Sequence, residues 1–404
     1  MHNPEEPYTL NQNSAGVNNA SFSDREELDQ LVRSGDYNHM AEVLGNNLRL
    51  NVLVQYEVEK IKAAYDKEQH LAEFLDEKDY EALALLKLLH PESFDHSIHT
   101  HEELRRAINA ITLPDGRRLI DLILEELPNH NLRPLDKGAV MHDLGKLEIP
   151  NFVTDNRLDE QGWEVAFKNM PFPEQQRMLG LYADRHNLDI PTEVFLEQPS
   201  MLRYVEDSIA KDDKRKYNDL VPVKLILSPE QVKELSAKGF PPEKSFAETM
   251  AAHEQRTGNI IRAIGKNDPE YELAARLAES HHSGISELVK QYPASTTSLV
   301  LSNRFAVMAQ VIKLADIKQA MKSRGRSYRG GPSTFAKKFN EIRTQVEAGK
   351  IIPYLAALWL EFELDEADRI NASAEAAATG ELPTAAEKQM IRHWADHQKF
   401  SENC

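Results

Sequence analysis

Residues 139–146 read Ala-Val-Met-His-Asp-Leu-Gly-Lys, so an apolar segment leads directly into His142 and Asp143. Placing an imidazole and a carboxylate within apolar surroundings is unfavourable unless a partner compensates them, and a divalent cation is an efficient partner. Histidine or aspartate also lies within or at the end of apolar helical stretches at four other places in the chain: His96, His253, the His281-His282 pair and Asp316. We therefore expect a metal centre built from segments that lie far apart in the sequence.

Helical periodicity surrounds these positions and predicts an all-α fold. Apolar residues recur at helical spacing in several segments, which are 48–61, 80–89, 101–112, 117–127, 136–146, 245–264, 270–282, 299–322 and 351–362. Strand signals are few. The best strand candidate is 220–227, and Pro222 makes it an edge strand or a loop.

The composition changes along the chain and suggests four parts. Residues 1–24 are rich in Asn, Ser and Pro, which is typical of a flexible tail. A helical N-terminal region is expected over 25–88, beginning with Ser23 as a helix cap, and a catalytic domain over 89–362. Residues 363–404 are expected to form a helical C-terminal tail.

Charge and cysteine content exclude several classes of protein. The 404 residues include 48 basic and 65 acidic side chains, for a net charge of −17, which argues against a surface for nucleic-acid polymers. No segment has the apolar length of a membrane span, and the start does not resemble a secretory signal, so a cytoplasmic location is expected. Cys404 is the one cysteine, which leaves nitrogen and oxygen atoms as the metal ligands.

The order of these residues resembles the HD superfamily of metal-dependent phosphohydrolases, and within it the HD-GYP family of cyclic-dinucleotide phosphodiesterases. That family has a His followed by Ser, then HD within HDxGK, a lone His, an HH pair and a final Asp. The chain supplies each in turn, as His96-Ser97, His142-Asp143-Leu144-Gly145-Lys146, His253, His281-His282 and Asp316. Residues 147–150, Leu-Glu-Ile-Pro, and 326–329, Arg-Ser-Tyr-Arg, match two further family elements.

This resemblance implies an HD-domain helical bundle with two metal ions. His96, His142, Asp143 and Asp316 would surround one metal, while Asp143, His253, His281 and His282 would surround the other. Adjacent residues on a helix point about 100° apart, so each adjacent pair could contact both ions. A hydroxide between the metals would attack the phosphodiester of a cyclic dinucleotide such as cyclic di-GMP. Iron or manganese is favoured.

Three further sets of residues have two interpretations each. Lys146 could stabilise or protonate the leaving oxygen, or it could bind helix carbonyls. Glu92 precedes His96 by one helical turn, so it could hold a third metal or favour a helix dipole. Arg326, Tyr328 and Arg329 could bind substrate phosphates or guanine edges, or belong to a solvated basic segment. His90, His99 and His101 are expected to be exposed or at helix ends.

Two departures from the family bear on substrate and regulation. After the HH pair, the family's Gly-Tyr-Pro loop is degenerate here, with only Tyr292-Pro293 retained over 283–293. Between Asp143 and His253 the chain has an insertion at about 155–225, which could form a lid, a partner-docking surface or an inert subdomain.

Three functions are compatible with this sequence. The leading one is a cyclic di-GMP phosphodiesterase. The second is a phosphohydrolase acting on another cyclic dinucleotide, nucleotide or phosphoester, which the altered loop favours. The third is a metal-binding adaptor without turnover, with a signalling protein as its partner. The N-terminal region could regulate the core or mediate self-association as a homodimer.

Overall fold

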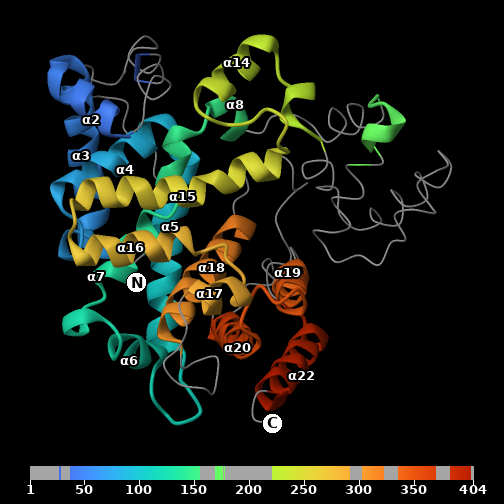
Figure 1. Ribbon diagram of the computed structural model, residues 1–404. Coiled ribbons are helices and arrows are strands. Elements are labelled where there is room, and N and C mark those ends of the chain that lie inside the picture. Colours follow the sequence, from blue (N-terminus) through green and yellow to red (C-terminus); the bar gives the residue numbers. More distant parts are fainter. Residues whose placement is uncertain are drawn as a thin grey trace, which may run out of the picture.

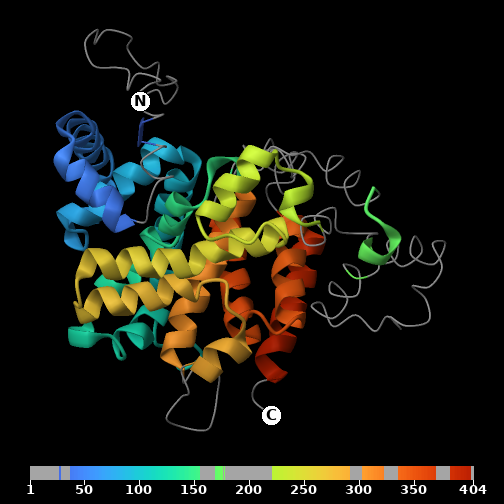
Figure 2. The same cartoon turned by 45° about the horizontal axis from the view of Figure 1, so that its top comes forward.

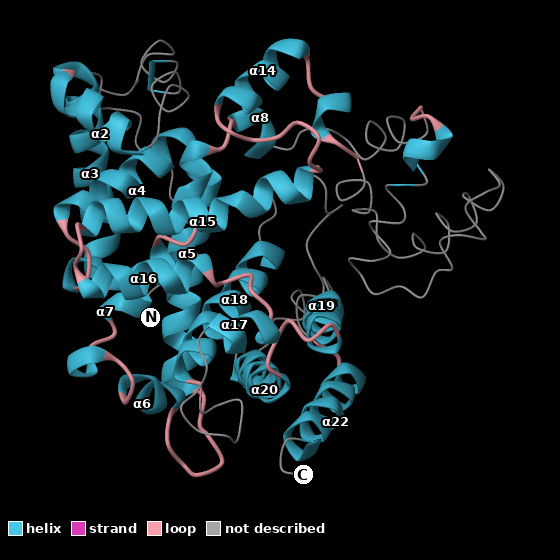
Figure 3. Cartoon of the chain, viewed as in Figure 1, coloured by secondary structure: helices cyan, strands magenta, loops and turns pink. Residues whose placement is uncertain are grey.

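The computed structural model describes residues 27–28, 37–154, 169–175, 177, 221–291, 303–322, 335–369 and 383–401. Within these ranges the regular elements are helices joined by loops (Figure 3). The β pairing found there consists of two isolated bridges, Thr112–Arg118 and Pro222–Ser245. The all-α prediction is confirmed for the described part of the chain.

The N-terminal helices lie together at one end of the molecule (Figure 1). They are α2 (Tyr37–Asn46), α3 (Leu48–Gln69) and α4 (Glu77–Leu89), with the short 3-10 helix η1 (Leu71–Glu73) between α3 and α4. A reciprocal capping box starts α4, in which the Asp76 backbone N–H donates to Asp79 Oδ2 over 2.9 Å. Residues 1–26 and the cap expected at Ser23 lie outside the described ranges.

The central elements carry the HD segment. They are α5 (Pro91–Ala110), α6 (Leu119–Leu124), η2 (Pro128–His130), α7 (Arg133–Val140), η3 (Leu144–Glu148) and α8 (Asn151–Thr154). The helix expected over 136–146 therefore ends early, at Val140, and His142 and Asp143 lie in the turn that connects α7 to η3. The expectation that this pair shares a helix is wrong.

The next elements build the second half of the site. They are η4 (Val223–Leu225), α14 (Pro229–Ala237), α15 (Phe246–Gly265), α16 (Pro269–Glu279), α17 (Ile285–Gln291) and α18 (Arg304–Lys322). Helices α15 and α16 form an antiparallel pair that lies side by side in both views (Figures 1 and 2). The strand or loop candidate at 220–227 is a loop with the short helix η4, and His281-His282 lie in a turn beyond α16 rather than on a helix.

The C-terminal helices cover the opposite end of the molecule from α2 and α3 (Figure 2). They are α19 (Phe335–Glu347), α20 (Pro353–Arg369) and α22 (Ala385–Ser401), and α22 packs on α20. Trp359 of α20 is fully buried and its indole N–H donates to Glu363 Oε1 over 2.7 Å. Because α20 continues to Arg369, the domain boundary expected after residue 362 falls inside a helix.

Two large hydrophobic clusters meet at the turn that holds His142 and Asp143, called the HD turn below. Ala139 belongs to a cluster formed mainly by α5, α6, α18, α19 and α20. Val140 and Met141 belong to another cluster, which contains the N-terminal helices together with α15 and α16. Leu277 and Ala278 of α16 are divided between the same two clusters. The N-terminal helices thus share a core with the HD segment, and the predicted ligands begin where the two cores adjoin.

Close contact between η3 and α15 depends on a glycine. A Cβ atom on Gly145 would lie 2.0 Å from the His253 carbonyl oxygen and 2.6 Å from the Thr257 backbone nitrogen. Real Cβ atoms do not approach other heavy atoms so closely, so any side chain at residue 145 would push η3 away from α15. The absence of a side chain therefore lets Asp143 approach His253.

We expect Gly145→Ala to lower the free energy of unfolding by roughly 1–3 kcal/mol, because the added methyl group overpacks a buried contact. Urea unfolding measured by circular dichroism tests this. The matched control is Gly45→Ala in α2, where an added Cβ meets no atom within 4 Å. That substitution should be neutral or slightly stabilising. Equal stability of the two variants would contradict the close packing of η3 on α15.

Candidate metal centre

The seven predicted ligands converge from five segments of the fold. His96 comes from α5, His253 from α15 and Asp316 from α18, and the two adjacent pairs come from the turns after α7 and α16. Their ligand atoms form three overlapping groups, each within 4.8 Å: His96, His142 and Asp316; His142, Asp143 and His281; and His253, His281 and His282. These buried groups could hold metal ions.

Three imidazoles are fixed in the protonation state that metal binding requires. The Nδ1 atom of His142 lies 2.8 Å from the Ala139 carbonyl oxygen, that of His253 lies 2.6 Å from the Met250 carbonyl oxygen, and that of His281 contacts the Ala278 carbonyl oxygen. A carbonyl only accepts, so each Nδ1 carries the proton and donates. The other ring nitrogen, Nε2, therefore carries no hydrogen and has a lone pair available for a metal. Metal-bound histidines commonly donate their other ring N–H to a backbone carbonyl in this way.

The three Nε2 lone pairs are buried and have no hydrogen-bond partner among the described residues. A buried acceptor without a partner is unfavourable by roughly 1–3 kcal/mol. Burial lowers the pKa of His281 well below its usual value and also lowers that of His253, so both rings stay neutral near pH 7. Neutral, inward-facing lone pairs fit divalent transition metals well.

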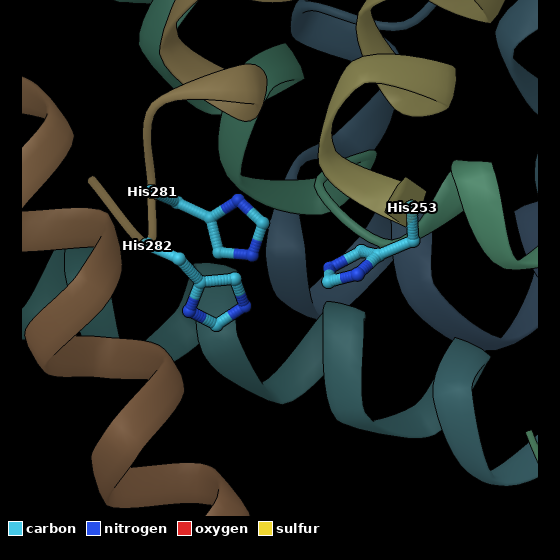
Figure 4. Close-up of side chains that lie close together, drawn as sticks. All are labelled: His253, His281 and His282. Carbon is cyan, nitrogen blue, oxygen red and sulfur yellow. The ribbon is translucent and has the colours of Figure 1, made fainter. Parts of the chain in front are cut away.

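His253, His281 and His282 face one another from two elements (Figure 4). The His281 and His282 ring centroids are 3.9 Å apart, and the His253 centroid is 5.5 Å from His281 and 5.4 Å from His282. The side chain of His282 is 42% exposed, unlike the two buried rings, so this group is the one nearest to solvent.

Asp143 lies between the two sides of the site. Its Oδ1 is 3.6 Å from His253 Nε2 and its Oδ2 is 3.8 Å from His142 Nε2, so the two oxygens point toward different imidazoles. Burial alone would raise the pKa of this carboxyl, but the Lys146 ammonium, 2.5 Å from Oδ2, helps to hold it well below its usual range. The carboxylate is therefore ionised and placed to contact two ions.

His96 and Asp316 belong to the ligand group that does not include His253, His281 and His282. His96 Nε2 lies 2.7 Å from Asp316 Oδ1, although the two residues are 220 positions apart in the sequence. Burial favours the neutral form of both groups, but the hydrogen bond from His96 keeps the pKa of Asp316 well below its usual range. Asp316 also lies 4.0 Å from His142 Nε2 and from His282 Nδ1, so it faces both histidine groups.

The adjacent ligand pairs follow helix ends for a physical reason. The last carbonyls of a helix lack intrahelical donors, and an imidazole N–H can satisfy one of them. His142 does so for α7 and His281 does so for α16. The imidazoles of His142 and His281 therefore cap a helix and also belong to the ligand groups. The residues that follow them, Asp143 and His282, belong to these groups as well.

Thr257 connects the turn that holds His142 and Asp143 to α15, and no ligand motif identifies this residue. Its hydroxyl donates to the His142 carbonyl oxygen over 2.9 Å and accepts from the Gly145 N–H over 2.7 Å. Thr257 lies one helical turn after His253 and is fully buried. The hint that could have found it is a polar residue on the same helix face as a predicted ligand.

Lys313 and Gln310 of α18 are further buried residues that ligand motifs do not identify. Lys313 Nζ lies 3.0 Å from the His282 carbonyl oxygen and 3.0 Å from that of Lys350. Gln310 is fully buried and also donates to the Lys350 carbonyl oxygen. Burial lowers the pKa of Lys313 to about 8. A lysine within an apolar helix is the available sequence signal.

Several predicted residues are not joined to these groups. Glu92 is exposed in the first turn of α5 and belongs to none of the three ligand groups. Its part in a third metal site stays a prediction. Arg326, Tyr328 and Arg329 lie outside the described residues, as does most of the 155–225 insertion. The segment expected to be a loop at 283–293 contains a helix instead, α17, and Tyr292-Pro293 are not described.

His90 lies at the junction of α4 and α5, as expected of a helix-end residue, but it is buried. His101 is also buried, contrary to expectation, with its Nε2 3.1 Å from Asp136 Oδ1, whereas His99 is exposed. Burial, reinforced by the charge of Lys146, lowers the pKa of His90 to about 4. His90 is therefore neutral near pH 7 in the folded protein.

We expect His90→Gln to make the protein less sensitive to acid. Between pH 6.5 and 4 an unfolded His90 takes up a proton and the folded one does not, so the free energy of unfolding falls as pH falls. This group should account for roughly 3 kcal/mol of that loss, from a shift between 6.5 and about 4. Urea unfolding of chelator-treated protein at several pH values tests it, and identical acid slopes in both proteins would contradict it.

Comparisons of the chain with family models, curated proteins and solved structures find no match. None of the helices in the described ranges has the length and apolar character needed to cross a membrane. The structure therefore supports an all-helical protein with buried His/Asp groups suited to metal binding.

Proposed function

We propose that this chain is a metal-dependent phosphodiesterase of the HD-GYP type, and that cyclic di-GMP is its substrate. The observation that carries the proposal is the set of three buried Nε2 lone pairs beside two ionised carboxylates. The order of these residues along the chain is that of the HD-GYP ligands. The described helices accord with the bundle that the resemblance implies.

Two metal positions suit the observed groups. His96, His142 and Asp316 would hold one ion, and His253, His281 and His282 would hold the other, with Asp143 contacting both. Divalent cations held there would neutralise charge on the phosphoryl oxygens and make water nucleophilic at neutral pH. Mixed imidazole and carboxylate ligands suit several divalent transition metals, and the resemblance to the HD-GYP family favours iron or manganese among them.

Lys146 is the residue proposed for proton transfer. Its ammonium contacts Asp143 Oδ2 and is only partly buried, so it can reach a substrate that occupies the exposed side of the site. From that position it can donate a proton to the leaving oxygen, which would otherwise depart as an unfavourable alkoxide. Arg326, Tyr328 and Arg329 remain candidates for binding the phosphates and guanine edges.

A different phosphoester substrate is favoured by one observation. Residues 285–291 form α17 directly after the HH turn, where the HD-GYP pattern has a Gly-rich loop. A helix has a fixed backbone with projecting side chains, whereas glycines leave a loop conformationally free, so α17 would recognise a substrate differently from a glycine-rich loop. Another cyclic dinucleotide or a nucleotide is therefore the second candidate. A non-catalytic adaptor would bind metal without turnover.

Asp143→Asn tests the proposed reaction. The amide preserves the side-chain shape but removes the charge that would hold both ions, so we expect hydrolysis of cyclic di-GMP to fall more than about 100-fold. Product formation by chromatography and metal content of anaerobically purified protein are the measurements. Asp143→Ala should behave in the same way.

The matched control is Asp95→Ala, which removes an exposed carboxylate beside His96 on α5 and should leave both measurements unchanged. Hydrolysis of other phosphoesters but not of cyclic di-GMP would support the second candidate. Metal binding without hydrolysis of any dinucleotide or nucleotide would support the adaptor. Absence of transition metal from the wild-type protein would refute the proposed centre.

A further inference from the structure

The His281-His282 turn is attached to α18 through its backbone. Lys313 Nζ lies 3.0 Å from the His282 carbonyl oxygen and 3.3 Å from the Ser283 carbonyl oxygen. A third carbonyl oxygen, that of Lys350, lies 3.0 Å from the same atom. One buried ammonium therefore joins the ligand turn to the segment that follows α19.

These three contacts assign Lys313 a role other than substrate binding. A lysine ammonium has three N–H donors, and three carbonyl oxygens surround this one. No donor remains for a phosphate, and an ammonium cannot ligate a metal. Lys313 is also 3% exposed, so a substrate could not reach it without moving the turn.

Gln310 adds a second connection between the same segments. Its Nε2 lies 3.2 Å from the Ser283 carbonyl oxygen and 3.1 Å from that of Lys350, and its Oε1 accepts from the Ile352 N–H over 3.3 Å. The backbone continues this attachment, because the Ile285 N–H donates to the Gly349 carbonyl oxygen over 3.1 Å. The backbone of the turn is thus held both by α18 and by the segment that follows α19.

Helix α18, to which the turn is attached, also carries the predicted ligand Asp316. Asp316 follows Lys313 by three residues on α18, so the two side chains lie on neighbouring parts of one helix face. Asp316 contacts His96, and Lys313 contacts the backbone of His282. One rigid helix therefore fixes the separation between the His96 side and the His281-His282 side of the site.

We propose that Lys313 is a positioning residue that sets the distance between the two metal positions by holding the His281-His282 turn on α18. This inference rests on the proposed metal centre. Without the Lys313 ammonium, the His282 carbonyl loses this donor, while the Ser283 and Lys350 carbonyls keep Gln310, so His282 is held less firmly relative to Asp316. The metal position formed by His253, His281 and His282 is the one affected.

The test is manganese binding to Lys313→Met, with Mn²⁺ alone as the probe. The wild-type protein should bind two Mn²⁺ ions whose electron paramagnetic resonance spectrum shows magnetic coupling. Lys313→Met should bind the second ion at least about tenfold more weakly, because supports behind metal ligands contribute about 10- to 100-fold in affinity. At one ion per chain it should give the six-line spectrum of an isolated Mn²⁺. Lys313→Gln retains two donors and should be intermediate.

The matched control is Lys318→Met, which removes a buried lysine from the same helix. Lys318 pairs with Glu103 of α5 and Glu366 of α20, which lie outside the ligand turn. This variant should lose thermal stability but keep two coupled ions. If Lys313→Met does not fold, Gln310→Leu tests the same attachment, and a weakened second ion is again the expected result.

The outcomes separate this inference from the proposed function. Two coupled ions bound with unchanged affinity in Lys313→Met would overturn the positioning role and leave the metal centre intact. Equal loss of the second ion in Lys313→Met and Lys318→Met would also overturn it, because the loss would then follow stability. A wild-type protein that binds no Mn²⁺ would refute the metal centre itself.

Discussion

The hydrogen bond from an imidazole Nδ1–H to the carbonyl three residues earlier is the interaction on which this site depends. It occurs at His142, His253 and His281. In each case it fixes the tautomer, orients the ring and leaves Nε2 directed inward. At α7 and α16 it also satisfies carbonyls that the helix end would leave without donors. One type of local interaction thus caps two helices and orients three candidate ligands.

The hydrophobic clusters on either side of the site hold these rings in a dry environment. Val140 and Met141 precede the HD pair and Ala278 lies beside His281, so the polar atoms emerge directly from packed apolar helices. The N-terminal helices join this arrangement through Lys137, which is fully buried and contacts Asp76, Asp79 and Tyr271. Removing one partner of such a buried ion pair would leave an uncompensated charge in the interior, which is strongly destabilising. The Lys137 contacts therefore hold α4, α7 and α16 together.

Charge is distributed unevenly between the surface and the site. The chain carries −17 overall, yet its described ligand groups adjoin the ammonium groups of Lys146 and Lys313. These two lysines differ in their exposure and in the groups that accept their hydrogen bonds. Lys146 is partly exposed and contacts the Asp143 carboxylate, whereas Lys313 is buried against backbone carbonyls. The ionised carboxylates of Asp143 and Asp316 offset these two ammonium groups, so under the proposed function the bound metal ions would supply the positive charge that an anionic substrate requires.

The sequence by itself determined the helical class and the types of ligand, because apolar periodicity and the order His, His-Asp, His, His-His, Asp are local properties. It misplaced the ends of α7 and α16, since those ends are set by side chains of His142 and His281 that cap them. The tertiary structure decided which ligands share a group. It also decided the close approach at Gly145 and the buried contacts of Thr257 and Lys313. Each of these joins residues from different helices, and periodicity along one helix carries no information about its neighbour.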